Sequence, residues 1–126
     1  IKFVLVVISL FVMAALAAPE VELYDSKYDN FDVDTIIKNS RLMKGYAKCF
    51  LGKGNCTPEG TTFKKLLPEA LESGCVKCTP KQRTLIRKVI RAVEKQLPEE
   101  FAELRKLYDP ENKYVEGVKK FLEEEN

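Results

Sequence analysis

The amino-acid sequence predicts an all-α protein, a single domain of about six short helices. From Asp32 to the C-terminus, apolar residues recur at helical spacing. Helix start and stop signals, mainly Thr-Pro pairs and single glycines, separate these apolar stretches. No stretch alternates apolar and polar residues as a strand does, and no hairpin dipeptide of the Asn-Gly type occurs.

The first 17 residues are expected to be a signal peptide. Phe3 to Leu16 is almost wholly apolar, and Ala15-Leu16-Ala17 has the small-x-small form of a cleavage site. A membrane anchor is the alternative, but the apolar run of about 14 residues is shorter than the roughly 20 that a spanning helix needs. We therefore expect a secreted, extracellular domain formed by residues 18–126, without stable membrane insertion.

Residues 18–31 are polar and predict an extended N-terminal arm. The first helix is expected to carry Val33, Ile36 and Ile37 and to end at Asn39-Ser40. Gly52 and Gly54 are expected to end the second helix. The apolar residues of this second helix are Leu42, Met43, Tyr46, Ala47 and Phe50.

In the third helix, Thr57 is the expected N-cap, Pro58 occupies the first turn, and Gly74 marks the end. Its apolar face consists of Phe63, Leu66, Leu67, Ala70 and Leu71. Pro68 lies inside this stretch, so the sequence predicts a kink or a division into two short helical pieces.

The clearest helix start is Thr79-Pro80-Lys81-Gln82, a capping box with proline at the first position. The apolar residues that follow are Leu85, Ile86, Val89, Ile90 and Val93. The basic residues of this fourth helix are expected to form a solvated face: Lys81, Arg83, Arg87, Lys88, Arg91 and Lys95. Pro98 opens a fifth helix that carries Phe101, Leu104 and Tyr108 and ends at Asp109-Pro110. A sixth carries Tyr114, Val115, Val118, Phe121 and Leu122.

The chain has four cysteines, at positions 49, 56, 75 and 78, and an even number in a small exported protein indicates disulfides. By lowering the entropy of the unfolded chain, a disulfide stabilises the fold by roughly 2.5 kcal/mol for Cys49–Cys56, 1.9 kcal/mol for Cys75–Cys78 and 3.6 kcal/mol for Cys49–Cys78. These free energies do not decide among the three possible pairings. Position favours sequential pairing, because each pair would then flank one connection between helices. A zinc site would need all four thiolates, and Cys-x6-Cys is poor zinc spacing. A redox role for Cys75-Val76-Lys77-Cys78 lacks the βαβ pattern that hosts it.

Composition argues against catalysis and against nucleic acid as a partner. The chain has no histidine, so neither a Ser-His nor a Cys-His nucleophile can form, and we expect no enzyme. Without Lys2, the remaining 20 basic side chains nearly balance the 19 acidic ones, which gives no global attraction to nucleic acid or acidic membranes. We expect no metal and no cofactor.

Several motifs together resemble the insect chemosensory proteins, also called the olfactory-segment-D family. The resemblance spans essentially the whole mature chain and includes the cysteine spacing. The other motifs are Tyr24-x3-Tyr28-Asp29-Asn30, Arg41-Leu42, Tyr46, Pro58-Glu59-Gly60, Leu67-Pro68-Glu69-Ala70-Leu71, Lys77 and Tyr108-Asp109-Pro110. Phe101 departs from the family, where many members have tryptophan, and this chain has no tryptophan.

The resemblance implies six helices around an internal hydrophobic channel and the sequential disulfides Cys49–Cys56 and Cys75–Cys78. It also implies a soluble carrier, expected to be a monomer, for small hydrophobic molecules such as semiochemicals or fatty-acid-like compounds. By analogy, the channel would be lined by Tyr28, Tyr46, Phe63, Leu66, Leu67, Leu85, Ile86, Val89, Tyr114 and Val118. The alternative function is a secreted interaction or developmental signalling protein that binds an unidentified receptor or surface partner through its exterior.

Overall fold

The computed structural model describes residues 21–124, so the expected signal peptide, residues 1–17, lies outside the described part of the chain. Six α-helices follow one short 3-10 turn, and no strand occurs between residues 21 and 124. The elements are η1 (Ser26–Tyr28), α2 (Val33–Lys38), α3 (Ser40–Phe50), α4 (Pro58–Ser73), α5 (Pro80–Gln96), α6 (Pro98–Tyr108) and α7 (Val115–Glu123). The predicted all-α class with six helices is confirmed.

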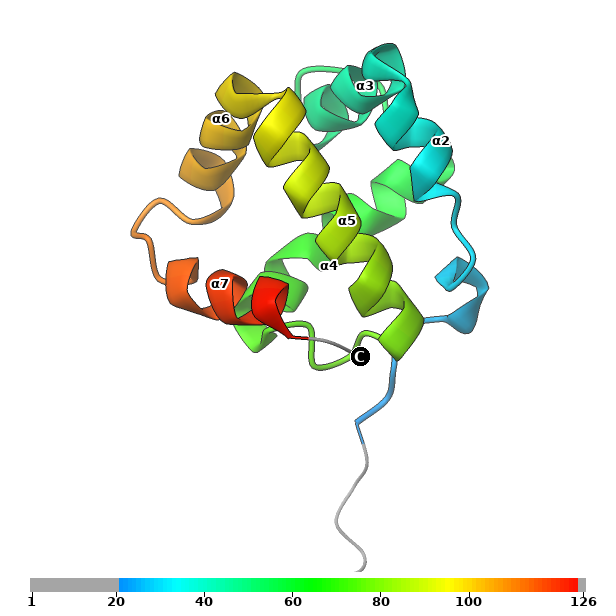
Figure 1. The fold of residues 1–126 in the computed structure, drawn as a ribbon, viewed down its shortest axis with the longest axis vertical. Coiled ribbons are helices and arrows are strands. Elements are labelled where there is room, and N and C mark those ends of the chain that lie inside the picture. Colours follow the sequence, from blue (N-terminus) through cyan, green and yellow to red (C-terminus); the bar gives the residue numbers. More distant parts are fainter. Residues whose placement is uncertain (1–20, 125–126) are drawn as a thin grey trace, which may run out of the picture.

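Helix α5 runs diagonally across the middle of the molecule, with α6 and α7 on one side of it and α2 and α3 on the other (Figure 1). The closest helix pairs are α2 with α3 and α5, α3 with α4 and α6, and α5 with α6. None of these pairs includes α7, whose attachment depends on side-chain contacts described below.

Local capping places the helix starts where the sequence predicted them. The Thr57 hydroxyl accepts a hydrogen bond from the backbone N–H of Gly60 at 3.0 Å, which caps α4. At the start of α5 the capping box is complete, with Gln82 N–H bonded to the Thr79 hydroxyl and Thr79 N–H bonded to the Gln82 amide oxygen, both at 3.1 Å. Gly74 ends α4 in the left-handed conformation, with φ of 68°, as its position predicted.

One local prediction was wrong, and one of the two alternatives for Pro68 is excluded. The N-terminal arm is not extended throughout, because the Asp25 side chain accepts a hydrogen bond from Lys27 N–H at 2.9 Å and nucleates the turn η1. Helix α4 is not divided at Pro68 but continues from Pro58 to Ser73. Pro68 is exposed, and the apolar residues on both sides of it belong to one face, so burying that face outweighs the missing hydrogen bond.

Both disulfides join sequential cysteines, and this prediction is confirmed. Cys49–Cys56 links the end of α3 to the start of α4, and Cys75–Cys78 spans the connection from α4 to α5, with Cα–Cα distances of 5.0 and 5.2 Å. None of the four cysteines is free, so no thiolate is available for zinc or for redox chemistry in this state.

Most of the buried apolar side chains fall into two separate clusters. The first contains Met43, Ala47 and Leu97, packed against Ile36, Ala92 and Val93. The second contains Cys75, Cys78 and Phe121, packed against Tyr24, Ala70, Ile86 and Ile90. The disulfide Cys75–Cys78 is thus part of the hydrophobic core rather than a surface staple.

Candidate ligand-binding site

Five aromatic side chains from the N-terminal segment, α3 and α4 form a continuous group, which we call the aromatic cluster. Its members are Tyr28, Phe31, Tyr46, Phe50 and Phe63. The ring of Phe63 meets those of Tyr28 and Phe31 edge to face at centroid distances of 5.2 and 5.1 Å. Such geometry aligns the positive edge of one ring with the negative face of the other. The cluster is therefore an ordered apolar surface.

Tyr46 is held within the cluster from two sides. Its hydroxyl oxygen accepts a hydrogen bond from the Thr57 hydroxyl at 3.2 Å. A Cβ added to the buried residue Gly60 would lie 3.4 Å from the Tyr46 ring, so the absent side chain lets the ring approach α4 closely. Because Thr57 donates this bond, the phenol proton of Tyr46 stays available for an acceptor. The site thus combines apolar rings with one oriented hydroxyl donor, as small-molecule sites commonly do.

All ten residues predicted to line the channel are half-buried. Tyr28, Tyr46 and Phe63 come together in the aromatic cluster, whereas Ile86 packs beside the Cys75–Cys78 disulfide. The other six lie on α4, α5 and α7 or next to it: Leu66, Leu67, Leu85, Val89, Tyr114 and Val118. Among residues 21–124 no ring contact joins Tyr114 to the cluster.

Phe31 and Phe50 belong to the cluster but were not predicted as site residues. Phe31 lies in the stretch interpreted as an extended arm, where no periodicity indicated an inward direction. Phe50 was recognised as part of the apolar face of its helix, and its partners could not be derived from that pattern. Its backbone carbonyl also accepts a hydrogen bond from the Tyr108 hydroxyl at 2.6 Å, and burial raises the pKa of Tyr108.

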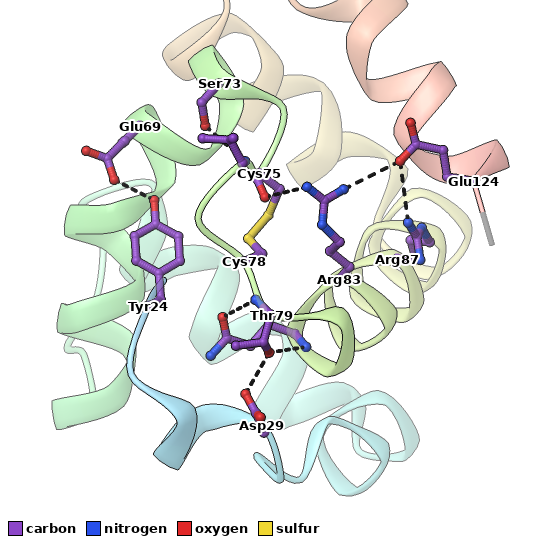
Figure 2. The surroundings of a disulfide bond; sticks show 12 residues. Tyr24, Asp29, Glu69, Ser73, Cys75, Cys78, Thr79, Arg83, Arg87 and Glu124 are labelled. Carbon is purple, nitrogen blue, oxygen red and sulfur yellow. Dashed lines mark hydrogen bonds and ion pairs between the residues drawn. A yellow bond between two sulfur atoms is a disulfide. The ribbon is translucent and has the colours of Figure 1, made fainter. Parts of the chain in front are cut away.

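Hydrogen bonds of Tyr24 attach the N-terminal arm to α4 and to the α4–α5 connection. Figure 2 shows the bond to Glu69 on α4. The Tyr24 hydroxyl donates to the Glu69 carboxylate at 2.7 Å, and Lys77 pairs with the same carboxylate at 3.3 Å. Burial, and then the bond to Glu69 and its negative charge, raise the pKa of Tyr24 to about 12. The hydrogen bond from Tyr24, followed by that from Lys77, lowers the pKa of Glu69.

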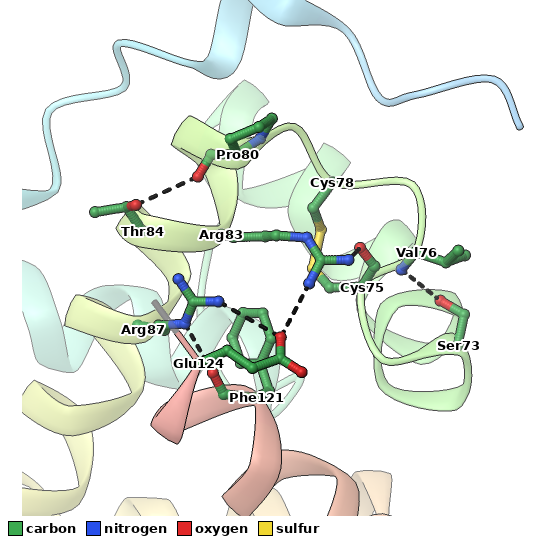
Figure 3. A network of polar contacts seen from close by, with 10 residues as sticks. All are labelled: Ser73, Cys75, Val76, Cys78, Pro80, Arg83, Thr84, Arg87, Phe121 and Glu124. Carbon is green, nitrogen blue, oxygen red and sulfur yellow. Dashed lines mark hydrogen bonds and ion pairs between the residues drawn. A yellow bond between two sulfur atoms is a disulfide. The ribbon is translucent and has the colours of Figure 1, made fainter. Parts of the chain in front are cut away.

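Three arginines spaced four residues apart on α5 hold the end of α7, and we call them the arginine row. They are Arg83 and Arg87, which Figure 3 shows, and Arg91. Arg87 Nε donates to the carbonyl oxygen of Phe121 at 2.7 Å, and Arg91 donates to the carbonyl oxygen of Leu122. These donors satisfy carbonyls that the helix end leaves without intrahelical partners, and their positive charge suits the negative end of the helix dipole.

The expectation that the basic residues of α5 form only a solvated face was wrong for Arg87, which is 6% exposed. Its guanidinium lies 4.7 Å from the ring centre of Phe121, and Arg83 lies 5.9 Å from the same ring. Arg83 also donates to the carbonyl oxygen of Cys75 at 2.8 Å, and both arginines pair with Glu124. The reason is the position of α7, which brings backbone acceptors and the ring of Phe121 against these guanidinium groups (Figure 3).

Two properties of residues 21–124 bear on other functions. No group of three or more Asp, Glu, Cys or His side chains in this range is placed to hold a metal ion. None of the helices described is both long enough and apolar enough to span a bilayer.

A small helical bundle with two local disulfides and an aromatic cluster has the features of a protein that binds small apolar molecules. Residues 24–116 match the family described as insect pheromone-binding family, A10/OS-D. The chain belongs to this family, the insect chemosensory proteins, as the sequence resemblance predicted.

Relatives of known sequence cover most of this chain. Allergen Tha p 1 of Thaumetopoea pityocampa is 45% identical over 119 residues, 94% of each chain. Ejaculatory bulb-specific protein 3 of Drosophila melanogaster is 43% identical over 109 residues, 86% of each chain.

Solved structures of chemosensory proteins share the fold. A chemosensory protein in complex with bromo-dodecanol superposes with a TM-score of 0.70 at 38% identity, covering 79% of this chain and 96% of the other. Antennal chemosensory protein A6 from the moth Mamestra brassicae superposes with a TM-score of 0.63 at 36% identity, covering 78% of this chain and 92% of the other.

Proposed function

We propose that this protein is a secreted carrier that binds long apolar molecules with one polar end, such as fatty alcohols, esters or acids, inside the helical bundle. The ten predicted residues would line the channel, with Phe31 and Phe50 added at its aromatic end. A similar chemosensory protein, solved with bromo-dodecanol, supports this class of ligand. Residues 1–17 would be the signal peptide and residues 18–126 the mature domain.

One observation carries the proposal, namely that the large side chains expected to face inward are half-buried rather than fully buried. Protein interiors are normally packed as densely as organic crystals, with few voids. Among residues 21–124, the buried large aliphatic and aromatic side chains are Val33, Met43, Leu97 and Phe121. A bundle whose apolar faces remain partly accessible has room for a guest, and the guest would complete the packing.

The polar end of the ligand would lie at Tyr46. The hydroxyl of Tyr46 has a proton to donate. The cation at the aromatic cluster, Lys27, lies over the ring of Tyr28 at 5.1 Å and is paired with Asp25 at 3.8 Å, so it is not placed at Tyr46 to pair with a carboxylate. Neutral acceptors such as an alcohol oxygen or an ester carbonyl therefore suit this position better than an ionised acid, whose desolvation would not be compensated.

Displacement of a fluorescent apolar probe tests the proposal, using C12–C18 alcohols, esters and acids as competitors. A ligand contact that buries about 50–100 Å² is worth roughly 1–2.5 kcal/mol, so Tyr46→Asp should weaken binding about tenfold or more. Lys95→Asp, the same replacement at an exposed position, should leave affinity nearly unchanged. Tyr46→Phe keeps the ring and should mainly reduce the preference for alcohols over hydrocarbons.

Circular dichroism must show that the Tyr46 variants keep their helical content. If folded Tyr46→Asp binds all competitors as the unmodified protein does, the polar end is not at Tyr46. If the unmodified protein binds none of them, the carrier proposal fails, and a surface interaction or signalling role takes its place. Mass determination of the secreted chain would test the cleavage after Ala17.

A further inference from the structure

The outer face of α3 carries charge of one sign only. Between Asp34 and Glu59 the sequence has five lysines or arginines and no acidic residue, although the whole chain is nearly neutral. Arg41, Lys44 and Lys48 follow one another at i, i+3 and i+7, so they share one side of α3, and we call them the α3 cationic face. A local charge excess of this kind attracts anionic partners even when the net charge is small.

The three cations are exposed and not neutralised by their surroundings. No carboxylate among residues 21–124 forms an ion pair with Arg41, Lys44 or Lys48, whereas Lys53, further along the same segment, pairs with Glu103 at 2.6 Å. Together with Ser40 and Gly45, they line a surface hollow of about 460 Å³. An anionic group could therefore enter between the cations without displacing a resident acid.

Gly45, which also lines this hollow, has no packing role that explains it. A Cβ at this position would meet no atom within 4 Å, and glycine inside a helix costs stability relative to alanine. What glycine does provide is close access to the helix backbone beside the cations. It leaves one edge of the hollow open.

We propose that the α3 cationic face docks reversibly on anionic phospholipid membranes, placing the carrier where apolar cargo is loaded or released. This inference rests on the proposed carrier function, because fatty alcohols and esters partition into bilayers. An anionic leaflet complements the charge of this face, and a bilayer, unlike an acidic peptide, also holds the apolar cargo. Helix α3 lies at the periphery of the bundle, on the other side of α5 from α7, so its face can reach a flat surface (Figure 1).

Flotation with lipid vesicles tests the proposal on the mature protein without cargo. The vesicles contain phosphatidylcholine with about one-third phosphatidylserine. Each basic residue near an anionic leaflet contributes about fivefold in affinity, so the double variant Lys44→Gln/Lys48→Gln should bind these vesicles about 25-fold more weakly. Binding should also fall as ionic strength rises from about 0.05 to 0.5 M. The matched control, Lys119→Gln with Lys120→Gln on α7, removes the same charge and should change binding little.

Gly45→Ala provides a second test, because it should raise thermal stability while weakening vesicle binding. Gly117→Ala on α7, where a Cβ also meets nothing within 4 Å, should raise stability without affecting vesicles. Equal partitioning into vesicles with and without phosphatidylserine would overturn the proposal, as would equal losses from the α3 and α7 lysine pairs. Binding of the unmodified protein to an acidic peptide but not to vesicles would assign the face to a protein partner instead.

Probe displacement on the same samples separates the two proposals. Loss of vesicle binding with normal probe binding would refute the membrane docking alone. Normal vesicle binding without probe binding would refute the carrier function and leave the docking surface standing.

Discussion

Removing the guanidinium of Arg87 should release α7 from the bundle. Arg87→Met keeps an unbranched apolar stem but loses the hydrogen bond to the Phe121 carbonyl at 2.7 Å and the contact with the Phe121 ring at 4.7 Å. A hydrogen bond from a charged donor contributes roughly 1.5–3 kcal/mol and a cation–π contact roughly 0.5–2 kcal/mol. The ion pair with Glu124 at 3.8 Å adds little because that carboxylate is largely exposed.

The expected loss is about 3 kcal/mol, a large part of the roughly 5–15 kcal/mol that stabilises a domain of this size. Thermal unfolding followed by circular dichroism should then shift downward by roughly 10–20 °C. If Tyr114 and Val118 line the interior, the variant should also bind the apolar probe more weakly at temperatures where it is still folded, because both residues belong to the segment that loosens.

Arg91→Met is the matched control, one helical turn further along α5. Arg91 is exposed, and its single hydrogen bond to the Leu122 carbonyl should contribute about 1 kcal/mol or less. Equal destabilisation by the two substitutions would refute the argument, because burial of Arg87 would then add nothing to the attachment of α7.

Two further predictions concern the arm and the start of α5. The pKa of Tyr24 is raised to about 12 from its ordinary value of about 10, so its stabilising contribution is complete below pH 10 and is lost as pH rises towards 12. Urea unfolding at pH 9 to 12 should therefore show a steeper loss of stability for the unmodified protein than for Tyr24→Phe; parallel curves would contradict this. Thr79→Val removes the cap of α5 and the hydrogen bond to Asp29 at 2.7 Å, and should cost about 1–3 kcal/mol. Thr61→Val, at an exposed hydroxyl near the start of α4, should cost little. Equal costs in urea unfolding would show that Thr79 contributes no more than a surface threonine.

Features that depend on neighbours along the chain were predictable. The capping box at Thr79 and Gln82, the N-cap at Thr57 and the left-handed Gly74 each involve residues within a few positions of one another. Helix number and approximate boundaries followed from them and from the apolar period, because both are local properties of the backbone. The cysteine pairing needed the family resemblance in addition, since chain entropy alone did not choose among the alternatives.

Features that depend on distant residues were decided by the tertiary structure alone. Arg87 is buried because Phe121, 34 positions later, brings its carbonyl and ring against α5, and nothing near Arg87 in the sequence distinguishes it from its solvated neighbours. Phe31 joins Tyr46 and Phe63, which lie 15 and 32 positions later in the sequence. By itself the sequence thus determined the helices, their caps and the family, since these depend on local hydrogen bonding and residue pattern. Which side chains meet between helices was determined only by packing, because burial in a folded chain is a property of the whole assembly of helices.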